Sequence, residues 1–274
     1  MKGACDAHFH VFGALDKYPA RDPNLRYKMP YAPLEEYLAH ARPMGFERFV
    51  FVQPSAYMRD NSCMLDAMHE MPGARGIVDI DEDAPDAELE KMNALGVRGV
   101  RVNVSPIHPP EPGLAQKLLP RIERLDARLS KLGWHLDFLL PGWLTNELLE
   151  KIGELKADCS LAHMGMFLAK DGVQQPGFQR LLGVLRNNRK IWVKLTGVYR
   201  MSTTPGFTDA APLARALMET APDRLIWGSD YPHLSFADTN SSEALFATLK
   251  GWARGDEATL RKILVDNPAK LFGF

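Results

Sequence analysis

Short apolar runs recur along the chain, separated by longer helical or loop segments, and this alternation constrains the fold more than any other feature. Each run is rich in Val, Ile, Leu or Phe, which is typical of parallel strands that are buried on both faces. The eight predicted strands are residues 4–9, 48–52, 76–80, 97–104, 134–140, 160–164, 191–195 and 224–228.

Amphipathic segments lie between the runs, with apolar residues at spacings of three and four and glycine near several ends. Helices are predicted at 33–45, 87–96, 114–133 and 145–158. Strands that alternate with helices indicate βαβ units and a parallel sheet. Eight such units in 274 residues predict an α/β protein with one (β/α)8 TIM barrel domain over residues 1–274. A doubly wound open sheet is the competing fold, although no G-x-G-x-x-G follows the first strand.

Composition excludes several classes of function. The formal net charge of -1 offers no electrostatic basis for binding nucleic acid or an anionic membrane. Cys5, Cys63 and Cys159 form no disulfide framework, and neither a signal peptide nor a membrane-spanning run is visible. We therefore expect a cytoplasmic globular protein, and the sequence leaves open whether it forms a homo-oligomer.

Reactive side chains gather near the carboxyl ends of the predicted strands, where a (β/α)8 barrel builds its active site. His8 and His10 close the first strand, His163 ends the sixth, and Asp230 follows the eighth. Other polar residues in or just after the strands are Gln53, Ser55, Asp79, Arg101, Asn103, Asp137, Lys194 and Arg200. Random placement would scatter such groups among the helices as well, so the arrangement predicts one site.

The segment DAHFHVFG, residues 6–13, places two histidines two positions apart, which on a strand puts both imidazoles on one face. With His163 and Asp230 they form a donor set that suits one Zn²⁺ with open positions. The same four groups are also able to polarise a carbonyl and relay a proton. A lone histidine such as His163 is often a hydrogen-bonded core residue, so the residues alone leave these alternatives open.

Several motifs, taken in order, resemble the amidohydrolase superfamily. They are HFH, GVRGVRVN, LAHMG, WVKLTGVYR, IWGSDYPH and the closing DNPAKLFGF, and they extend over essentially the whole chain. Within the superfamily they most resemble the branch of 2-pyrone-4,6-dicarboxylate lactonase and related sugar-acid lactonases. The resemblance implies a TIM-barrel hydrolase that opens a small carboxylated lactone in aromatic or sugar-acid catabolism.

The resemblance also assigns roles to residues. It places the H-x-H motif of the family on His8 and His10, its later histidine on His163 and its catalytic aspartate on Asp230. Asp230 is then the general base that activates water, and the histidines stabilise the developing oxyanion. No cofactor is expected to be obligatory, and the alternative is one Zn²⁺ held by these four residues.

Substrate binding is expected from residues at the same strand ends. Arginine suits this role because its planar fork binds a carboxylate through two hydrogen bonds. The residues expected to bind substrate are Arg101, Arg200, Ser55, Asn103, Tyr57 and His233.

Two departures from the family pattern narrow these expectations. Binuclear amidohydrolases carry a bridging lysine or glutamate after the fourth strand and a histidine after the fifth, whereas this chain has Arg101 and Asp137. A two-metal site is therefore not expected. The pyrone-dicarboxylate lactonases have a second arginine six residues after the first, where this chain has Ile107, so that particular dicarboxylate is less strongly predicted. The alternatives to a lactone hydrolase are a metal-dependent decarboxylase, a lactone isomerase, and a barrel that binds an acidic metabolite without catalysis.

Overall fold

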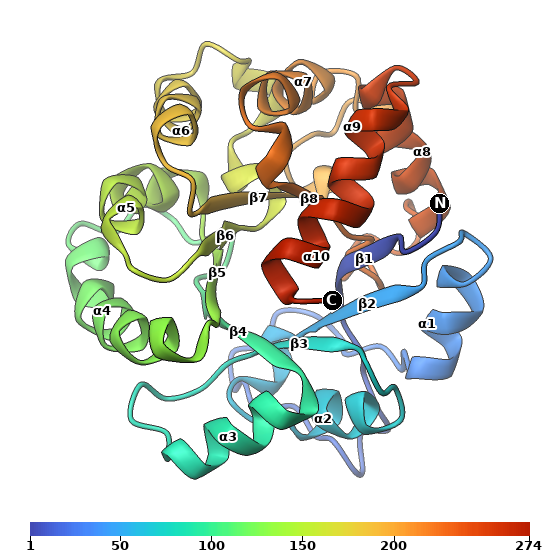
Figure 1. Ribbon diagram of the computed structural model, residues 1–274, viewed down its shortest axis with the longest axis vertical. Helices are drawn as coiled ribbons and strands as arrows, with labels where there is room; N and C mark the ends of the chain where they lie inside the picture. The colour runs from blue at the N-terminus through green and yellow to red at the C-terminus, as the bar shows by residue number, and fades with distance from the viewer.

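The computed structural model describes residues 1–274 and confirms the (β/α)8 barrel. The eight parallel strands lie side by side in sequence order, from β1 to β8, and Figure 1 shows them as a ring with helices outside it. Their bounds are β1 Cys5–Phe9, β2 Arg48–Val52, β3 Arg75–Val78, β4 Val97–Asn103, β5 His135–Leu139, β6 Cys159–Leu161, β7 Ile191–Leu195 and β8 Leu225–Trp227. All eight predicted strands are present.

An outer helix follows each strand. These helices are α1 Leu34–Ala41, α2 Ser62–His69, α3 Asp86–Leu95, α4 Leu114–Leu132, α5 Gly142–Glu154, α6 Pro176–Asn187, α7 Ala211–Thr220 and α8 Ser242–Ala253. In α4, Ile122, Leu125 and Leu129 are buried at spacings of three and four, and the helix ends at Gly133 in the left-handed conformation. The four predicted helices are confirmed, with shifts of up to four residues at their ends.

The barrel closes where β1 meets the chain that leaves β8. The backbone N–H of His10 donates to the carbonyl of Tyr231 at 2.8 Å, and the N–H of Asp230 donates to the carbonyl of His8 at 2.8 Å. A Cβ atom at Gly228 would lie only 2.4 Å from the backbone nitrogen of His8, so glycine is required for this approach. Closure therefore brings the two histidines of the first strand beside Asp230.

A register shift between Asp6 and Phe9 marks a bulge in β1. Before it, Cys5 and Ala7 belong to the apolar cluster inside the barrel; after it, Phe9 packs on Tyr37 of α1 in a stack with ring centroids 3.7 Å apart. Bulges commonly redirect side chains next to active sites. His8 lies within the shifted stretch, and its ring contacts Lys194 of β7 and Asp230.

The end of the barrel opposite the site is filled by the C-terminal segment. Figure 1 shows α10, Asn267–Phe272, lying across the centre of the ring. Phe272 joins the inner apolar cluster, and its carbonyl accepts a hydrogen bond from Arg75, the first residue of β3. Asn267 donates to the carbonyl of Leu225, the first residue of β8. The DNPAKLFGF motif thus closes the amino-terminal end of the barrel.

None of the helices combines the length and the apolar character that a bilayer crossing requires.

Candidate active site

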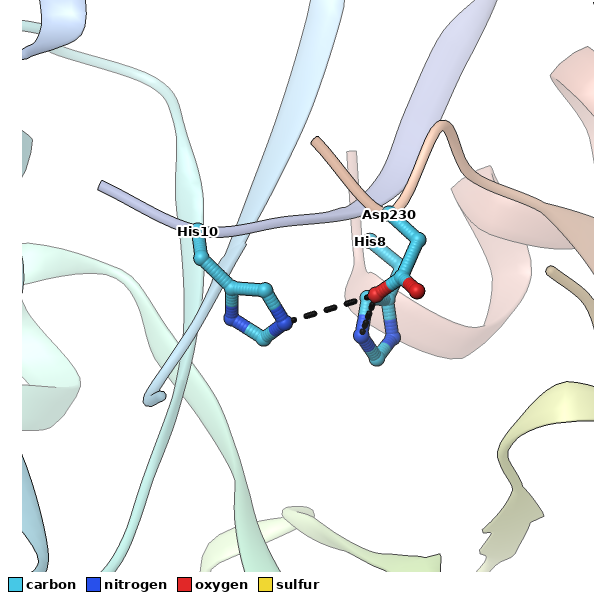
Figure 2. A group of neighbouring side chains, drawn as sticks. All are labelled: His8, His10 and Asp230. Carbon is cyan, nitrogen blue, oxygen red and sulfur yellow. Dashed lines mark ion pairs between the residues drawn. The ribbon is translucent and has the colours of Figure 1, made fainter. Parts of the chain in front are cut away.

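Three histidines converge on one carboxylate, that of Asp230, at the carboxyl end of the strands. His8 Nε2 and His10 Nε2 each lie 3.4 Å from Asp230 Oδ1, and His163 Nε2 lies 3.8 Å from Asp230 Oδ2. Figure 2 shows His8, in β1, and His10, just after its end, both pointing toward Asp230. All four side chains are almost completely buried. The structure thus brings together the four residues that the sequence singles out as catalytic.

Backbone strain is concentrated at two of these residues. His163 has a φ of 51° and Asp230 a φ of 57°, a left-handed conformation that residues other than glycine seldom adopt. Strand β6 accordingly ends at Leu161, whereas the sequence predicts a strand that continues to residue 164. A Cβ at Gly197 would lie 2.5 Å from His163 Nδ1, so the ring of His163 fits only against a glycine. Such strain persists where surrounding contacts impose it, which is common in functional sites.

The second oxygen of the Asp230 carboxylate, Oδ2, is held by two residues that follow β7. The hydroxyl of Tyr199 donates to Oδ2 at 2.5 Å, and Arg200 Nε lies 3.4 Å from the same oxygen. The guanidinium of Arg200 lies over the rings of Tyr199 and Phe236, at 5.2 and 5.6 Å from their centroids. Sequence reasoning identifies Arg200 but not Tyr199, since a tyrosine beside an apolar strand carries no signal in its spacing.

The charge states of the group follow from burial and from close neighbours. Burial alone would raise the pKa of the Asp230 carboxyl, but His163 and Arg200 more than offset this effect and hold its pKa well below the ordinary value. Burial lowers the pKa of His163 to about 3 and also lowers the pKa values of His8 and His10. At neutral pH the site therefore holds an ionised carboxylate among neutral imidazoles.

A layer of buried charges lies beneath the histidines. Lys194 Nζ is 2.7 Å from Asp137 Oδ1 and 3.3 Å from His8 Nδ1. Arg101 Nε lies 3.8 Å from Asp137 Oδ2, and Arg101 Nη1 donates to the carbonyl of Gln53 at 2.8 Å. Asp137 is therefore a buried carboxylate paired with two cations inside the barrel, whereas Asp79, which is 21% exposed, pairs with Arg121.

Unpaired polar atoms identify the space in which a ligand would be bound. Buried donors and acceptors in native proteins nearly always have partners, so a cluster without them indicates groups that bind a ligand or water. Of the eleven such atoms in the protein, six belong to residues in or shortly after β1, β2, β4 and β5: His8 Nε2, Gln53 Oε1, Tyr57 Oη, Arg101 Nε, Asn103 Oδ1 and Asp137 Oδ2.

The predicted binding residues other than the two arginines make the following contacts. Ser55 Oγ lies 3.4 Å from the hydroxyl of Tyr27, a residue of the long segment after β1 that sequence reasoning did not identify. Asn103 ends β4. Tyr57 packs against Phe12 with ring centroids 5.7 Å apart. His233 lies 3.3 Å from the hydroxyl of Ser242 on α8, and no contact joins its ring to the other histidines.

Three of the four catalytic candidates have the spacing of ligands around one metal ion. Each of His8, His10 and Asp230 offers one donor atom, and these three atoms lie within 4.8 Å of one another. Zinc bonds of about 2.0–2.1 Å place tetrahedral ligands about 3.3 Å apart, close to the 3.4 Å separations found here. By distance alone, the group is able to hold one divalent ion.

Comparison with known proteins places the chain among amidohydrolases and lactone hydrolases. The amidohydrolase family model Amidohydro_2 matches residues 5–274. A protein named 4-sulfomuconolactone hydrolase from Hydrogenophaga intermedia is 36% identical over 99% of this chain and 89% of its own. A protein named 2-pyrone-4,6-dicarboxylate hydrolase from Comamonas testosteroni is 30% identical over 98% of this chain and 90% of its own.

Two further matches extend the range of related activities and support the fold. A D-galactarolactone isomerase from Agrobacterium fabrum is 29% identical over 99% of this chain and 91% of its own. The crystal structure of a probable 2-pyrone-4,6-dicarboxylic acid hydrolase from Acinetobacter baumannii, with citric acid bound, superposes with a TM-score of 0.87. It is 27% identical, and the match covers 99% of this chain and 100% of that chain.

Proposed function

This chain belongs to the amidohydrolase family, and from that premise we propose that it hydrolyses the ring ester of a lactone bearing a carboxylate. The observation that carries the proposal is the buried carboxylate of Asp230, ionised and within 3.4–3.8 Å of three imidazoles. The names of the relatives that act on 4-sulfomuconolactone and 2-pyrone-4,6-dicarboxylate support it.

In the proposed reaction Asp230 acts as the general base. Its carboxylate removes a proton from water as the water oxygen attacks the lactone carbonyl carbon. The tetrahedral intermediate then collapses, the bond from carbon to the ring oxygen breaks, and the proton held by Asp230 passes to that oxygen. General base help of this kind contributes about 10²–10⁴-fold.

The histidines are proposed to stabilise the charge that develops on the carbonyl oxygen. A hydrogen-bond donor preorganised for an oxyanion is worth about 10²–10³-fold in kcat. Burial of His8 and His163 increases this effect because few water molecules compete inside the barrel. Both side chains already face Asp230, so the carbonyl and the attacking water would be bound next to each other.

Arginines are proposed to orient the substrate through its carboxylate. Arg200 is the better placed of the two, because it lies on two aromatic rings and its side chain keeps 20% of its surface exposed. Arg101 is deeper: it donates to the Gln53 carbonyl, and its Nε faces Asp137 Oδ2 at 3.8 Å, so less of its guanidinium is free for a ligand. The neighbour bound to citric acid, a tricarboxylate, supports an acidic ligand class.

The distances between the donor atoms suit a single Zn²⁺, but the hydrogen bonds of the ligand histidines do not. A histidine that ligates metal usually donates its second N–H to an acceptor. His10 meets this requirement, with Nδ1 2.7 Å from the Val52 carbonyl, but His8 Nδ1 faces the Lys194 side-chain nitrogen. The hydrogen bonding of His8 thus does not suit ligation of a metal ion through Nε2.

The proposal is tested with a panel of carboxylated lactones, including sulfomuconolactone, pyrone dicarboxylate and aldarolactones, followed by proton release and by NMR of the products. We expect ring opening of at least one member and a loss of about 10³-fold or more in the Asp230→Asn variant. Products that retain a ring would instead support isomerisation, as the galactarolactone isomerase relative suggests. No change in any lactone, or nearly full activity in Asp230→Asn, would contradict the proposal.

A second arm tests the role of metal in the same assay. Because the surroundings of His8 do not suit ligation, we expect activity to survive prolonged dialysis against a chelator. Elemental analysis of the dialysed protein is the control that metal has been removed. Loss of activity that returns on addition of Zn²⁺ would instead support the single-ion alternative.

A further inference from the structure

The two histidines of β1 have different partners at their second ring nitrogen. His10 Nδ1 lies 2.7 Å from the backbone carbonyl of Val52. A carbonyl oxygen only accepts hydrogen bonds, so the proton of this neutral imidazole is on Nδ1. Nε2 of His10 then carries a lone pair, and it faces Asp230 Oδ1 at 3.4 Å. Two acceptors thus face each other across this contact.

At His8 the partner of Nδ1 is a hydrogen-bond donor instead of an acceptor. Its Nδ1 lies 3.3 Å from Lys194 Nζ, and Lys194 is itself 2.7 Å from the carboxylate of Asp137. An ammonium group in such an ion pair has donors and no acceptor. Nδ1 of His8 must therefore accept, which leaves the proton on Nε2, the nitrogen that faces Asp230.

We infer that Lys194 is a positioning residue that holds His8 in the tautomer opposite to that of His10, so that the two histidines of one motif perform different tasks. Lys194 contacts His8 and Asp137, and no contact joins it to Asp230. It acts through His8.

The chemical consequence rests on the proposed function. The Nε2–H of His8 is a donor for the lactone carbonyl oxygen as negative charge develops there. Nε2 of His10 and Oδ1 of Asp230 are both acceptors, and together they bind the two hydrogens of the attacking water. Asp230 takes one of these hydrogens during attack, and His10 orients the water by accepting the other. Without Lys194 the proton of His8 is free to move to Nδ1, and the carbonyl loses its donor.

The first experiment measures the tautomers directly by nitrogen NMR of protein labelled with ¹⁵N-histidine at neutral pH. Signals are assigned with the His8→Gln and His10→Gln variants. We expect a protonated Nε2 and a bare Nδ1 for His8, and the reverse for His10. The same tautomer at both residues would overturn the inference. This measurement needs no substrate, so it stands even if the lactone proposal fails.

The second experiment replaces Lys194 with Met, which keeps a long unbranched side chain but removes the donor. We expect the His8 signals to shift toward the Nδ1–H form, and kcat to fall about 10²-fold with KM changed less than threefold. Because Asp137 then keeps only the more distant Arg101 as a cation, the variant carrying both Asp137→Asn and Lys194→Met provides a second test in which the carboxylate charge left by Lys194 is also removed. An unchanged His8 tautomer in both variants would overturn the inference.

Ser160→Ala is the matched control for damage to the buried network. Ser160 donates to Asp137 Oδ1 at 2.6 Å but does not contact His8. We expect its His8 tautomer to match that of the wild type. A shift as large as that of Lys194→Met would show that packing, and not donation by Lys194, determines the tautomer.

Discussion

At the scale of single residues, the site depends on how one carboxylate is surrounded. Asp230 Oδ1 faces the two histidines of β1, while Oδ2 receives the Tyr199 hydroxyl and lies beside Arg200. One oxygen is thus held in place, and the other faces the histidines. This division explains how a buried carboxylate stays ionised without a direct ion pair on the oxygen that is proposed to take up the proton.

Arg200→Met is predicted to weaken substrate binding. Loss of a charged hydrogen bond worth about 1.5–3 kcal/mol corresponds to a rise in KM of about 10–150-fold. The cation also helps to hold down the pKa of Asp230, so the acid limb of the profile of kcat/KM against pH should move to higher pH. Steady-state kinetics across pH measures both effects.

Arg200→Lys is the matched variant, since it keeps the charge but loses the planar fork. An intermediate KM is expected, with an acid limb close to that of the wild type. If KM is unchanged in Arg200→Met, the carboxylate of the substrate is bound elsewhere.

At the scale of elements, β1 is the strand on which the site depends. Its bulge is stabilised by Asp6, whose Oδ1 accepts from the backbone N–H groups of His8 and Ser229, while Oδ2 accepts from the Tyr37 hydroxyl. One side chain thus joins β1, α1 and the segment after β8. Burial nevertheless raises the pKa of Asp6 to about 6, since these hydrogen bonds offset the loss of hydration only in part.

This shift predicts how stability depends on pH. In the unfolded chain Asp6 ionises near pH 4, whereas in the folded protein it ionises near 6, so folding favours the protonated form. Its contribution to stability is complete below about pH 4 and is lost as pH rises through about 6. As pH rises over that interval, the unfolding free energy of the wild type should therefore fall by about 3 kcal/mol relative to that of Asp6→Asn.

Urea denaturation of both proteins at several pH values between 4 and 8 measures this difference. Subtracting the variant removes the contributions of all other titrating groups, which the two proteins share. A difference that stays constant across the interval would show that Asp6 ionises alike in the folded and unfolded states.

At the scale of the whole molecule, the two ends of the barrel have separate tasks. The carboxyl ends of the strands carry the polar site, and the amino ends are closed by apolar side chains of the C-terminal segment. Phe272 is completely buried there, in a perpendicular contact with His135 at 5.3 Å between ring centroids. Stability and chemistry are thus assigned to opposite ends, as is usual in barrels of this kind.

Phe272→Ala is predicted to lower the unfolding free energy by about 3–5 kcal/mol, because it leaves a cavity inside the barrel. Well below its lowered melting temperature, the variant should retain kcat and KM within about twofold. Thermal denaturation and steady-state kinetics on the same preparation test both statements.

Phe274→Ala is the comparison variant. Phe274 is only partly buried and lies beneath the guanidinium groups of Arg48 and Arg75, so a loss of about 1 kcal/mol is expected. A large change in kcat in Phe272→Ala would mean that the two ends of the barrel are coupled.

The sequence by itself determined the eight strands, their pairing with helices and the group of three histidines and one carboxylate. Hydrophobic periodicity is local, and the rule that active sites lie at the carboxyl ends of strands converts positions along the chain into positions in space. The family resemblance then distinguished His163 from a core histidine, which periodicity alone does not do.

Only the tertiary structure decided which atoms face one another. The bulge at β1, the left-handed turns at His163 and Asp230, and the contacts of Tyr199 and Lys194 depend on strands far apart in sequence. The spacing of His8 and His10 predicts two equivalent imidazoles, but a carbonyl beside one and an ammonium beside the other make them different. Hydrogen-bond partners are chosen by the packing of the closed barrel, and this is the physical reason that a local motif did not reveal them.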